Sequence, residues 1–329
     1  MIDLPMYPLR FEPIFQYRLW GGRRLSGLLK TSLPDDGPIG EAWILSDRPD
    51  HASVVADGPL KGRTLTQLME QASKPLLGKS AGRFPRFPLL LKFLDAHATL
   101  SVQVHPSDAQ KEFLPPGESG KTEAWVVLEA GAESRIYAGL KPGITANELR
   151  KSLAEKTLEK DLSWFTPKAD DAVLIKSGTV HTLKDVVVFE VQENSDVTFR
   201  LYDWDRIDAK TGRPRDLQVD QAIACVDFDQ TALEPVSPSI EATLPVLRER
   251  LLSCEQFKIW RHQGDAPFKV GAPNIARVLV CLSGEGLLDR DGETYPVGQG
   301  QVLLLPAIVG EWAFRPSESV NLLEVSLPE

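Results

Sequence analysis

Short hydrophobic runs separated by glycine- and proline-containing turns occupy most of the chain. In the first two thirds these runs lie at residues 88–94, 100–106, 123–130, 133–140, 171–178, 186–192 and 197–204. The runs resume from residue 275, with turn sequences at 283–286, 289–292 and 297–300. Short strands between closely spaced turns favour an antiparallel barrel or sandwich over a parallel sheet. The pattern therefore predicts a mainly β protein whose two halves have similar architecture, each a small β-barrel.

Two segments with a helical pattern interrupt the strands. Residues 64–69 begin a short helix, which we expect to end before Pro75 because proline disrupts a helix interior. Thr145 and Glu148 match the capping box that begins many helices. The helix predicted from this point runs through residue 162, along an apolar stripe formed by Leu149, Leu153 and Leu158.

The chain also divides at a change of composition near its middle. Residues 216–227 have the pattern of a connecting helix, and the proline- and serine-containing stretch 234–240 is typical of a linker. We therefore predict an N-terminal domain over residues 1–215, a connector over 216–240 and a C-terminal barrel over 241–329.

Composition and charge limit the classes of partner. A chain of 329 residues with 42% hydrophobic and 25% charged residues has the usual composition of a soluble globular protein. Its 37 basic and 46 acidic residues give a net charge of -9, which argues against a nucleic acid or an anionic membrane as the main partner. An anionic small molecule remains compatible, because the potential of a binding site is local.

Cysteine usage and the N-terminus indicate the compartment. The three cysteines are widely spaced and form neither a disulfide framework nor a CxxC metal motif; they are Cys225, Cys254 and Cys281. The first residues lack the charged and apolar regions of a signal peptide, and no apolar run approaches the roughly 20 residues of a membrane span. We expect a cytoplasmic protein without membrane segments.

Four polar residues within or beside the apolar runs are candidate metal ligands. Gln103 and His105 point to the same side of one strand, and such buried groups cost a few kcal/mol unless they have partners. Glu123 lies in another apolar run, and His181 follows a glycine-containing turn. All four side chains are suitable ligands for a first-row metal that a barrel interior could bring together. Any one of them alone is more often a structural residue, and we interpret His51, His97 and His262 as structural.

Four motifs in the same order make the chain resemble a known family. VQVHPSD, GKTEAW, SGTVH and SDVTFRLYDWDR closely resemble the type I mannose-6-phosphate isomerases, and WGGRRL, IGEAWILSD and the C-terminal LLLPA strand extend the resemblance over nearly the whole chain. The resemblance implies two cupin-type (jelly-roll) barrels and interconversion of mannose 6-phosphate and fructose 6-phosphate through an enediol(ate). It also implies one Zn²⁺ per chain, bound by Gln103, His105, Glu123 and His181.

The resemblance also suggests which residues contact the sugar phosphate. The family places its active-site arginine in the SDVTFRLYDWDR motif, which implies that Arg200 is catalytic and binds substrate, through the phosphate or the enediolate. Tyr202 shares its strand face, so we expect it to orient Arg200 and contact substrate, with plain packing as the alternative.

Two lysines complete the expected catalytic set. Lys121 shares a strand face with Glu123, and a nearby zinc ion would lower its pKa and suit it to carry a proton; the alternative is an ordinary lysine at the barrel mouth. Lys92 is a charge within an apolar run, at a position where the family has a lysine near its site. The alternative for Lys92 is an ion pair with Asp95 or Glu41.

The sequence departs from the family pattern around its last ligand. Lys176 replaces a usual proline, and Thr182-Leu183-Lys184 replace Ala-Ile-Gly, so the mouth of the site and its sugar preference could differ. The C-terminal barrel lacks histidines and glutamates at ligand spacing, and we expect it to be structural.

Two other functions remain in competition with the isomerase. One is a metal-containing cupin that binds a sugar phosphate in a regulatory, non-catalytic role; Lys121 and Arg200 argue against it, since a binder needs no Lewis acid with an open position. The other is an iron-dependent cupin dioxygenase, which Gln103 and the resemblance disfavour. The chain is either a monomer or a homodimer, and the sequence does not decide between them.

Overall fold

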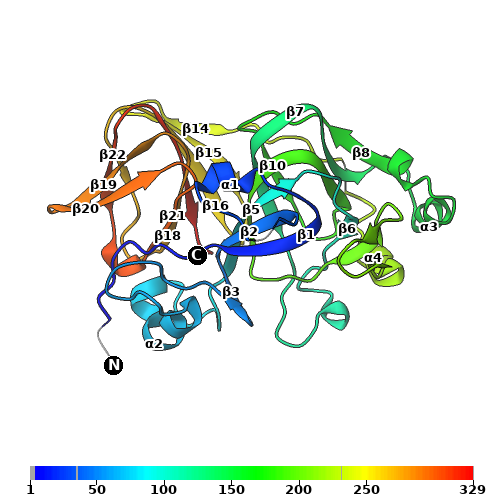
Figure 1. The fold of residues 1–329 in the computed structure, drawn as a ribbon, viewed down its shortest axis with the longest axis horizontal. Helices are drawn as coiled ribbons and strands as arrows, with labels where there is room; N and C mark the ends of the chain where they lie inside the picture. Colours follow the sequence, from blue (N-terminus) through cyan, green and yellow to red (C-terminus); the bar gives the residue numbers. More distant parts are fainter. Residues whose placement is uncertain (1–3, 35, 231, 329) are drawn as a thin grey trace.

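Strands predominate in the computed structural model, which describes residues 4–34, 36–230 and 232–328 (Figure 1). The mainly β fold predicted from the sequence is confirmed. Within the described residues the α-helices are α1 (Leu25–Leu29), α2 (Leu65–Leu77), α3 (Ala146–Ala154) and α4 (Val219–Cys225). In the same part of the chain, the helices are all too short or too polar to cross a membrane.

One large sheet belongs to the N-terminal part of the chain. Its nine strands are β1 (Ile14–Gly22), β2 (Ile39–Leu45), β5 (Leu89–Ala96), β6 (Val102–Val104), β7 (Glu123–Leu140), β8 (Leu162–Phe165), β9 (Ala172–Ile175), β10 (His181–Glu193) and β11 (Phe199–Tyr202). The main path of hydrogen-bonded neighbours is β1-β2-β5-β10-β6-β11, and β7 joins β10 to β8 and β9. Two short hairpins, β3–β4 and β12–β13, flank this sheet; their strands are Asp47–Arg48, His51–Ala52, Ile207–Asp208 and Arg213–Pro214.

The central strand of this sheet is β10, which is buried on both faces. It pairs antiparallel with β5, β6 and β7. Val187, Phe189 and Val191 pack into one hydrophobic cluster, whereas Val186 and Val188 pack into another. Burial on both faces explains why residues 186–189 of this strand are all apolar rather than alternating.

Two sheets belong to the C-terminal part of the chain. The six-stranded sheet contains β14 (Ser239–Ala242), β15 (Leu247–Ser253), β16 (Lys258–Gly264), β23 (Val320–Ser326), β18 (Arg277–Ser283) and β21 (Val302–Leu305). The four-stranded sheet contains β17 (Phe268–Val270), β22 (Trp312–Pro316), β19 (Glu285–Arg290) and β20 (Glu293–Gly298). The turns predicted between strands β18 to β21 lie where the sequence placed them.

The N-terminal and C-terminal sheets lie side by side and share a hydrophobic core (Figure 1). Phe93 and Phe189 from the first group belong to the same buried cluster as Val278 and Leu323 from the second. The first residues reinforce the contact, because Leu9 pairs with Leu304 through two backbone hydrogen bonds. The division into domains at residues 215 and 241 stays a prediction.

The predicted ends of two helices were wrong, for identifiable reasons. Helix α2 continues past Pro75 to Leu77, because its break lies earlier, at Ala72, and Pro75 falls in the first turn after the break. Helix α3 begins after the Thr145 capping box as predicted but ends at Ala154, not at residue 162. Lys156 there adopts a left-handed conformation with φ of 57°, which stops the helix before the short 3₁₀ turn Leu158–Asp161. The predicted connecting helix is α4.

Candidate functional site

The four predicted ligand residues come from three neighbouring strands. Gln103 lies in β6 and His105 directly follows this strand. Glu123 and His181 are the first residues of β7 and β10. The antiparallel register places His181 opposite Gln103. Strand β7 also pairs with β10, and Glu123 lies opposite Gln192 near the end of β10. Strand pairing therefore explains why His181 lies beside Gln103, whereas Glu123 pairs with the far end of β10 and reaches His181 through its side chain.

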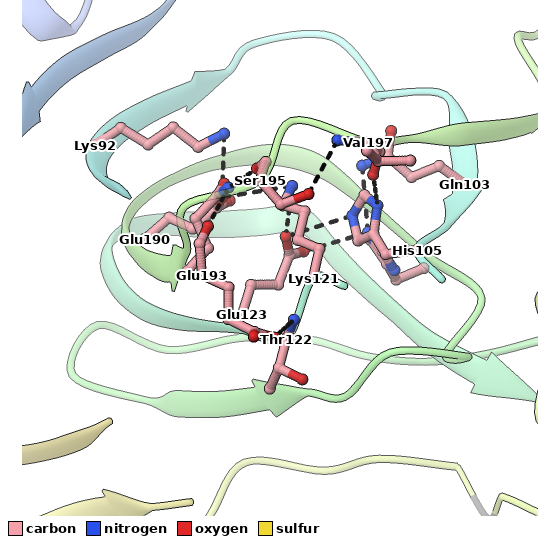
Figure 2. A network of polar contacts seen from close by, with 12 residues as sticks. Lys92, Gln103, His105, Lys121, Thr122, Glu123, Glu190, Glu193, Ser195 and Val197 are labelled. Atoms are coloured by element: carbon pink, nitrogen blue, oxygen red, sulfur yellow. Dashed lines mark hydrogen bonds and ion pairs between the residues drawn. The ribbon is translucent and has the colours of Figure 1, made fainter. Parts of the chain in front are cut away.

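The structure gathers these side chains around a common point. Glu123 Oε1 lies 3.3 Å from His181 Nε2, and Glu123 Oε2 lies 3.4 Å from His105 Nε2. The candidate ligand atoms of these three residues all lie within 4.8 Å of one another, and the residues are buried. Gln103 Nε2 is 3.2 Å from His181 Nε2, so the amide adjoins the same point (Figure 2).

The histidine rings are oriented so that their Nε2 lone pairs face the carboxylate. His105 Nδ1 donates to the Val197 carbonyl at 2.8 Å, and His181 Nδ1 donates to the Thr179 carbonyl at 2.9 Å. Burial and the charge of Lys121 lower the pKa of His105 to about 3, and burial lowers the pKa of His181, so both rings are neutral at pH 7. With Nδ1 protonated, Nε2 of each ring is an acceptor.

This donor set fits a divalent metal ion. His105 Nε2 is buried without a hydrogen-bond partner, and it faces Glu123 Oε2, another acceptor. Acceptors that face one another in a buried site need a cation between them, and two imidazoles with one carboxylate are a common ligand set of zinc. Gln103 fits as a fourth ligand after a half-turn of its amide, because Ser101 Oγ, now 3.2 Å from Oε1, can equally accept from the NH₂ group.

Lys121 and Glu190 are the next charged residues in the cavity beyond Glu123. Lys121 Nζ lies 2.8 Å from Glu123 Oε2 and 3.9 Å from Glu190 Oε1. Glu190 Oε2 accepts a hydrogen bond of 2.9 Å from Trp125 Nε1. Burial, followed by the charge of Glu123, raises the pKa of Glu190. Glu190 therefore lies between Lys121 and Lys92.

Lys92 continues the alternation of charges. Its Nζ lies 3.1 Å from Glu190 Oε1 and 3.9 Å from Glu41 Oε2, so the expected pair with Glu41 is present but Glu190 is nearer. Asp95 instead binds Arg24 at 2.7 Å. Burial lowers the pKa of Lys92, but Glu190 and Glu41 outweigh burial and raise it above its ordinary value, so Lys92 is charged.

A cavity of about 420 Å³ opens beside these groups. A volume of this order suits a small metabolite. Its polar lining includes Gln103, Glu123, Lys121, Glu190, Lys92 and Arg200. Trp20, the first residue of the WGGRRL motif, also lines the cavity. Gly21 has a packing role as well, since a Cβ there would lie 2.3 Å from the Gly40 nitrogen.

Arg200 lies in the cavity wall, on strand β11 next to the Gln103 strand. Its Nη1 donates to the Asp216 carbonyl at 2.9 Å, while its Nε is buried without a hydrogen-bond partner. Burial and then the charge of Arg215 lower the pKa of the Arg200 guanidinium. Arg215 is itself bound by Asp203 at 2.8 Å, so Arg200 is the less neutralised of the two. This part of the wall is suited to an anion.

Tyr202 is not brought to the cavity with Arg200. The β11–β6 register shifts between Arg200 and Tyr202, so the strict alternation of faces is lost between them. Tyr202 instead packs against Trp204 at a centroid distance of 5.3 Å, and its hydroxyl lies 3.4 Å from Asp205 Oδ2. Its expected contact with substrate stays a prediction.

Glu190 is the main residue of this site that sequence reasoning missed. It lies in the apolar run 186–192, directly opposite Lys92 in the β10–β5 register. A charged residue in an apolar run was the signal that drew attention to Lys92, and the same signal applied to Glu190. Glu41 and Arg18 were also missed as a pair; Glu41 Oε1 and Oε2 each lie 3.0 Å from an Arg18 nitrogen.

The chain is similar to proteins named mannose-6-phosphate isomerase over nearly all of its length. Residues 9–157 match the family described as phosphomannose isomerase type I, catalytic domain. Mannose-6-phosphate isomerase ManA of Bacillus subtilis is 34% identical over 308 residues, which cover 93% of this chain and 95% of ManA. The mannose-6-phosphate isomerase of Streptococcus mutans is 33% identical over 311 residues, 93% of this chain and 95% of that protein. The crystal structure of mannose 6-phosphate isomerase from Bacillus subtilis superposes with a TM-score of 0.89 at 28% identity, covering 97% of this chain and 99% of that one.

Glu41 gives the free energy of unfolding a defined acid dependence. Burial raises the pKa of its carboxyl, but Arg18 and Lys92 outweigh burial and lower it to about 2. In the unfolded chain the pKa of Glu41 returns to its ordinary value of 4.5. Below that pH the unfolded state binds a proton that the folded state does not, so the free energy of unfolding falls. Between about pH 5 and about pH 3 the loss through this group should be about 2 kcal/mol.

Urea unfolding at the two pH values measures this loss. The Glu41→Gln variant cannot titrate at this position, so its free energy of unfolding should fall by about 2 kcal/mol less than that of the wild type over the same interval. Equal losses in the two proteins would show that Glu41 is not held ionised by Arg18 and Lys92.

Proposed function

The chain belongs to the type I phosphomannose isomerase family, and we propose that it interconverts mannose 6-phosphate and fructose 6-phosphate in the cavity beside His105, Glu123 and His181. The observation that carries the proposal is the convergence of two imidazole lone pairs and a carboxylate next to a cavity whose wall includes Arg200 and Lys121. A non-catalytic sugar phosphate binder would not need this buried set of acceptors.

We infer that one Zn²⁺ per chain is held by His105, His181, Glu123 and Gln103. The two Nδ1 hydrogen bonds to backbone carbonyls fix both rings for this role, as is usual for metal-binding histidines. When bound, the ion supplies a Lewis acid that stabilises negative charge on the sugar oxygens. Lys121 then balances the carboxylate of Glu123 from the cavity side.

Arg200 is proposed to bind the anionic substrate. The sugar phosphate brings about two negative charges at pH 7, and a planar guanidinium can hold a phosphate through two hydrogen bonds. Nη1 of Arg200 is held by the Asp216 carbonyl, which fixes the group in the cavity wall. Arg18 and Arg215 line the same cavity and add positive potential, although Glu41 and Asp203 neutralise them in part.

Proton movement is assigned to Lys121 and Glu190. The isomerisation transfers one proton from C2 to C1 and one from O2 to O1, with no net oxidation of the sugar. A base in the cavity removes the C2 proton, the electron pair forms the enediolate, and the conjugate acid returns the proton to C1. Both residues line the cavity, and Glu190 Oε1 lies 3.9 Å from Lys121 Nζ, so their charges interact although they share no hydrogen bond.

Lys92 is proposed to serve this pair as a fixed positive charge. Its ammonium group lies 3.1 Å from Glu190 Oε1 and is buried, so it holds Glu190 in place and limits the spread of negative charge. In this role Lys92 stays protonated and transfers no proton itself.

A coupled assay of purified, zinc-loaded protein tests the activity itself. We expect conversion of fructose 6-phosphate to mannose 6-phosphate in both aerobic and anaerobic buffer, because the reaction uses no oxygen. Removing the metal with a chelator should abolish turnover, and adding Zn²⁺ should restore it. Binding of the sugar phosphate without turnover would instead support the regulatory hypothesis, and a requirement for oxygen would support a dioxygenase.

Alanine at a ligand position should remove the metal. Glu123→Ala and His105→Ala each delete one of the converging ligands, so we expect zinc content far below one per chain and no measurable turnover. His97→Ala is a suitable control, because His97 is exposed and does not line the cavity. A Glu123→Ala protein that still holds stoichiometric zinc would refute the ligand assignment.

Arg200→Ala should separate metal binding from catalysis. The variant keeps all four ligands, so zinc content should stay at the wild-type level while kcat/KM falls by about 100-fold or more, as for other lost anion contacts. Arg200→Lys retains the charge but lacks the planar guanidinium group, so its kcat/KM should lie between those of the wild type and Arg200→Ala. Unchanged kinetics in Arg200→Ala would remove this residue from the site.

A further inference from the structure

The backbone at Thr122 is held by a single residue that does not line the cavity. Glu193 Oε2 accepts a hydrogen bond of 2.8 Å from the Thr122 N–H, and the Glu193 N–H donates to the Thr122 carbonyl at 3.1 Å. Thr122 lies just before strand β7 and is 7% exposed. Its N–H therefore depends on the Glu193 side chain for a partner (Figure 2).

Thr122 separates the two residues that project into the site. Lys121 and Glu123 both line the cavity, whereas Thr122 and Glu193 do not. Glu193 thus acts on this segment from the side opposite to the cavity. A carboxylate in that place cannot contact the sugar, but it can determine where the side chains on either side of Thr122 lie.

The chain that follows Glu193 holds the other side of the site. Ser195 Oγ donates to the Ser119 carbonyl at 2.8 Å, which ties the same turn to the segment leading into Lys121. Two residues later, the Val197 carbonyl accepts the 2.8 Å hydrogen bond from His105 Nδ1. One short turn, residues 193–197, therefore contacts the approach to Glu123 and the ring of His105 (Figure 2).

We propose that Glu193 is a positioning residue of the isomerase, whose hydrogen bond to Thr122 sets the place of Lys121 and Glu123 relative to His105. The proposal rests on the proposed function for its catalytic consequence, but its consequence for metal binding can be measured separately. Residues that orient ligands in this way typically change metal affinity or activity by 10–100-fold when they are replaced.

Two variants separate the hydrogen bond from the charge. Burial raises the pKa of Glu193 to about 7, so its carboxyl group is only partly ionised at neutral pH. Glu193→Gln removes the ionisable group but keeps an oxygen that can accept from Thr122, whereas Glu193→Met has a similar length and no oxygen acceptor. We expect zinc affinity, measured by competition with a chelating dye, to fall by about 10–100-fold in Glu193→Met and to stay within about threefold of the wild type in Glu193→Gln. In the coupled assay with saturating zinc, kcat should fall in Glu193→Met while KM changes little.

A third variant covers the case in which Glu193→Met does not fold. Glu193→Asp keeps the carboxyl group but shortens the side chain by one methylene group, so it should weaken the contact with Thr122 and lower zinc affinity below that of Glu193→Gln. Circular dichroism shows whether each variant is folded. The order wild type, Gln, Asp, Met for both zinc affinity and kcat is the expected result.

Several results would overturn the positioning role. Wild-type zinc affinity and kcat in folded Glu193→Met or Glu193→Asp would show that the hydrogen bond does not position the site. An equal loss in Glu193→Gln and Glu193→Met would assign the effect to the charge. Absence of turnover in the wild type would reject the proposed function, whereas the zinc affinities of the variants would still decide the positioning role.

Discussion

A carboxylate and two imidazole lone pairs face one another inside this protein, and the rest of the site is built around that contact. Glu123 lies 3.3 and 3.4 Å from the two Nε2 atoms, and no group of the described residues donates a hydrogen bond to His105 Nε2. Such an arrangement is unfavourable without a cation. The backbone carbonyls of Val197 and Thr179 maintain it, because they fix the proton of each ring on Nδ1.

The charges beyond this centre follow from the same requirement. A buried carboxylate needs a cation, and each cation here is shared with a further carboxylate, from Lys121 through Glu190 and Lys92 to Glu41. Arg18, which is partly exposed, ends the series near solvent. The strand pairing of β5 with β10 places Lys92 against Glu190, so the fold itself sets the alternation. A site of this kind presents cations to an anionic sugar while leaving few buried charges unpaired.

Much of this could be predicted from the sequence, and the exceptions have physical causes. Alternation along a strand placed Gln103 and His105 together, and motif order identified Glu123 and His181. The same alternation failed for Tyr202, because the register shifts after Arg200. Glu193 gave no signal, since its role depends on a contact with the Thr122 backbone that only the folded chain creates. The end of α3 was missed because the left-handed conformation of Lys156 interrupts an otherwise continuous apolar stripe.

The departures from the family pattern near His181 can now be located. Leu183 is buried in a hydrophobic cluster, and Thr182 Oγ donates to the Leu100 carbonyl at 2.9 Å; neither lines the cavity. Lys176 is exposed, but its carbonyl accepts from the Thr179 N–H at 3.1 Å, and the Thr179 carbonyl in turn holds His181. A substitution at position 176 can therefore affect His181 only through the shape of this turn. Lys176, Thr182 and Leu183 therefore change the surroundings of the cavity and not its lining.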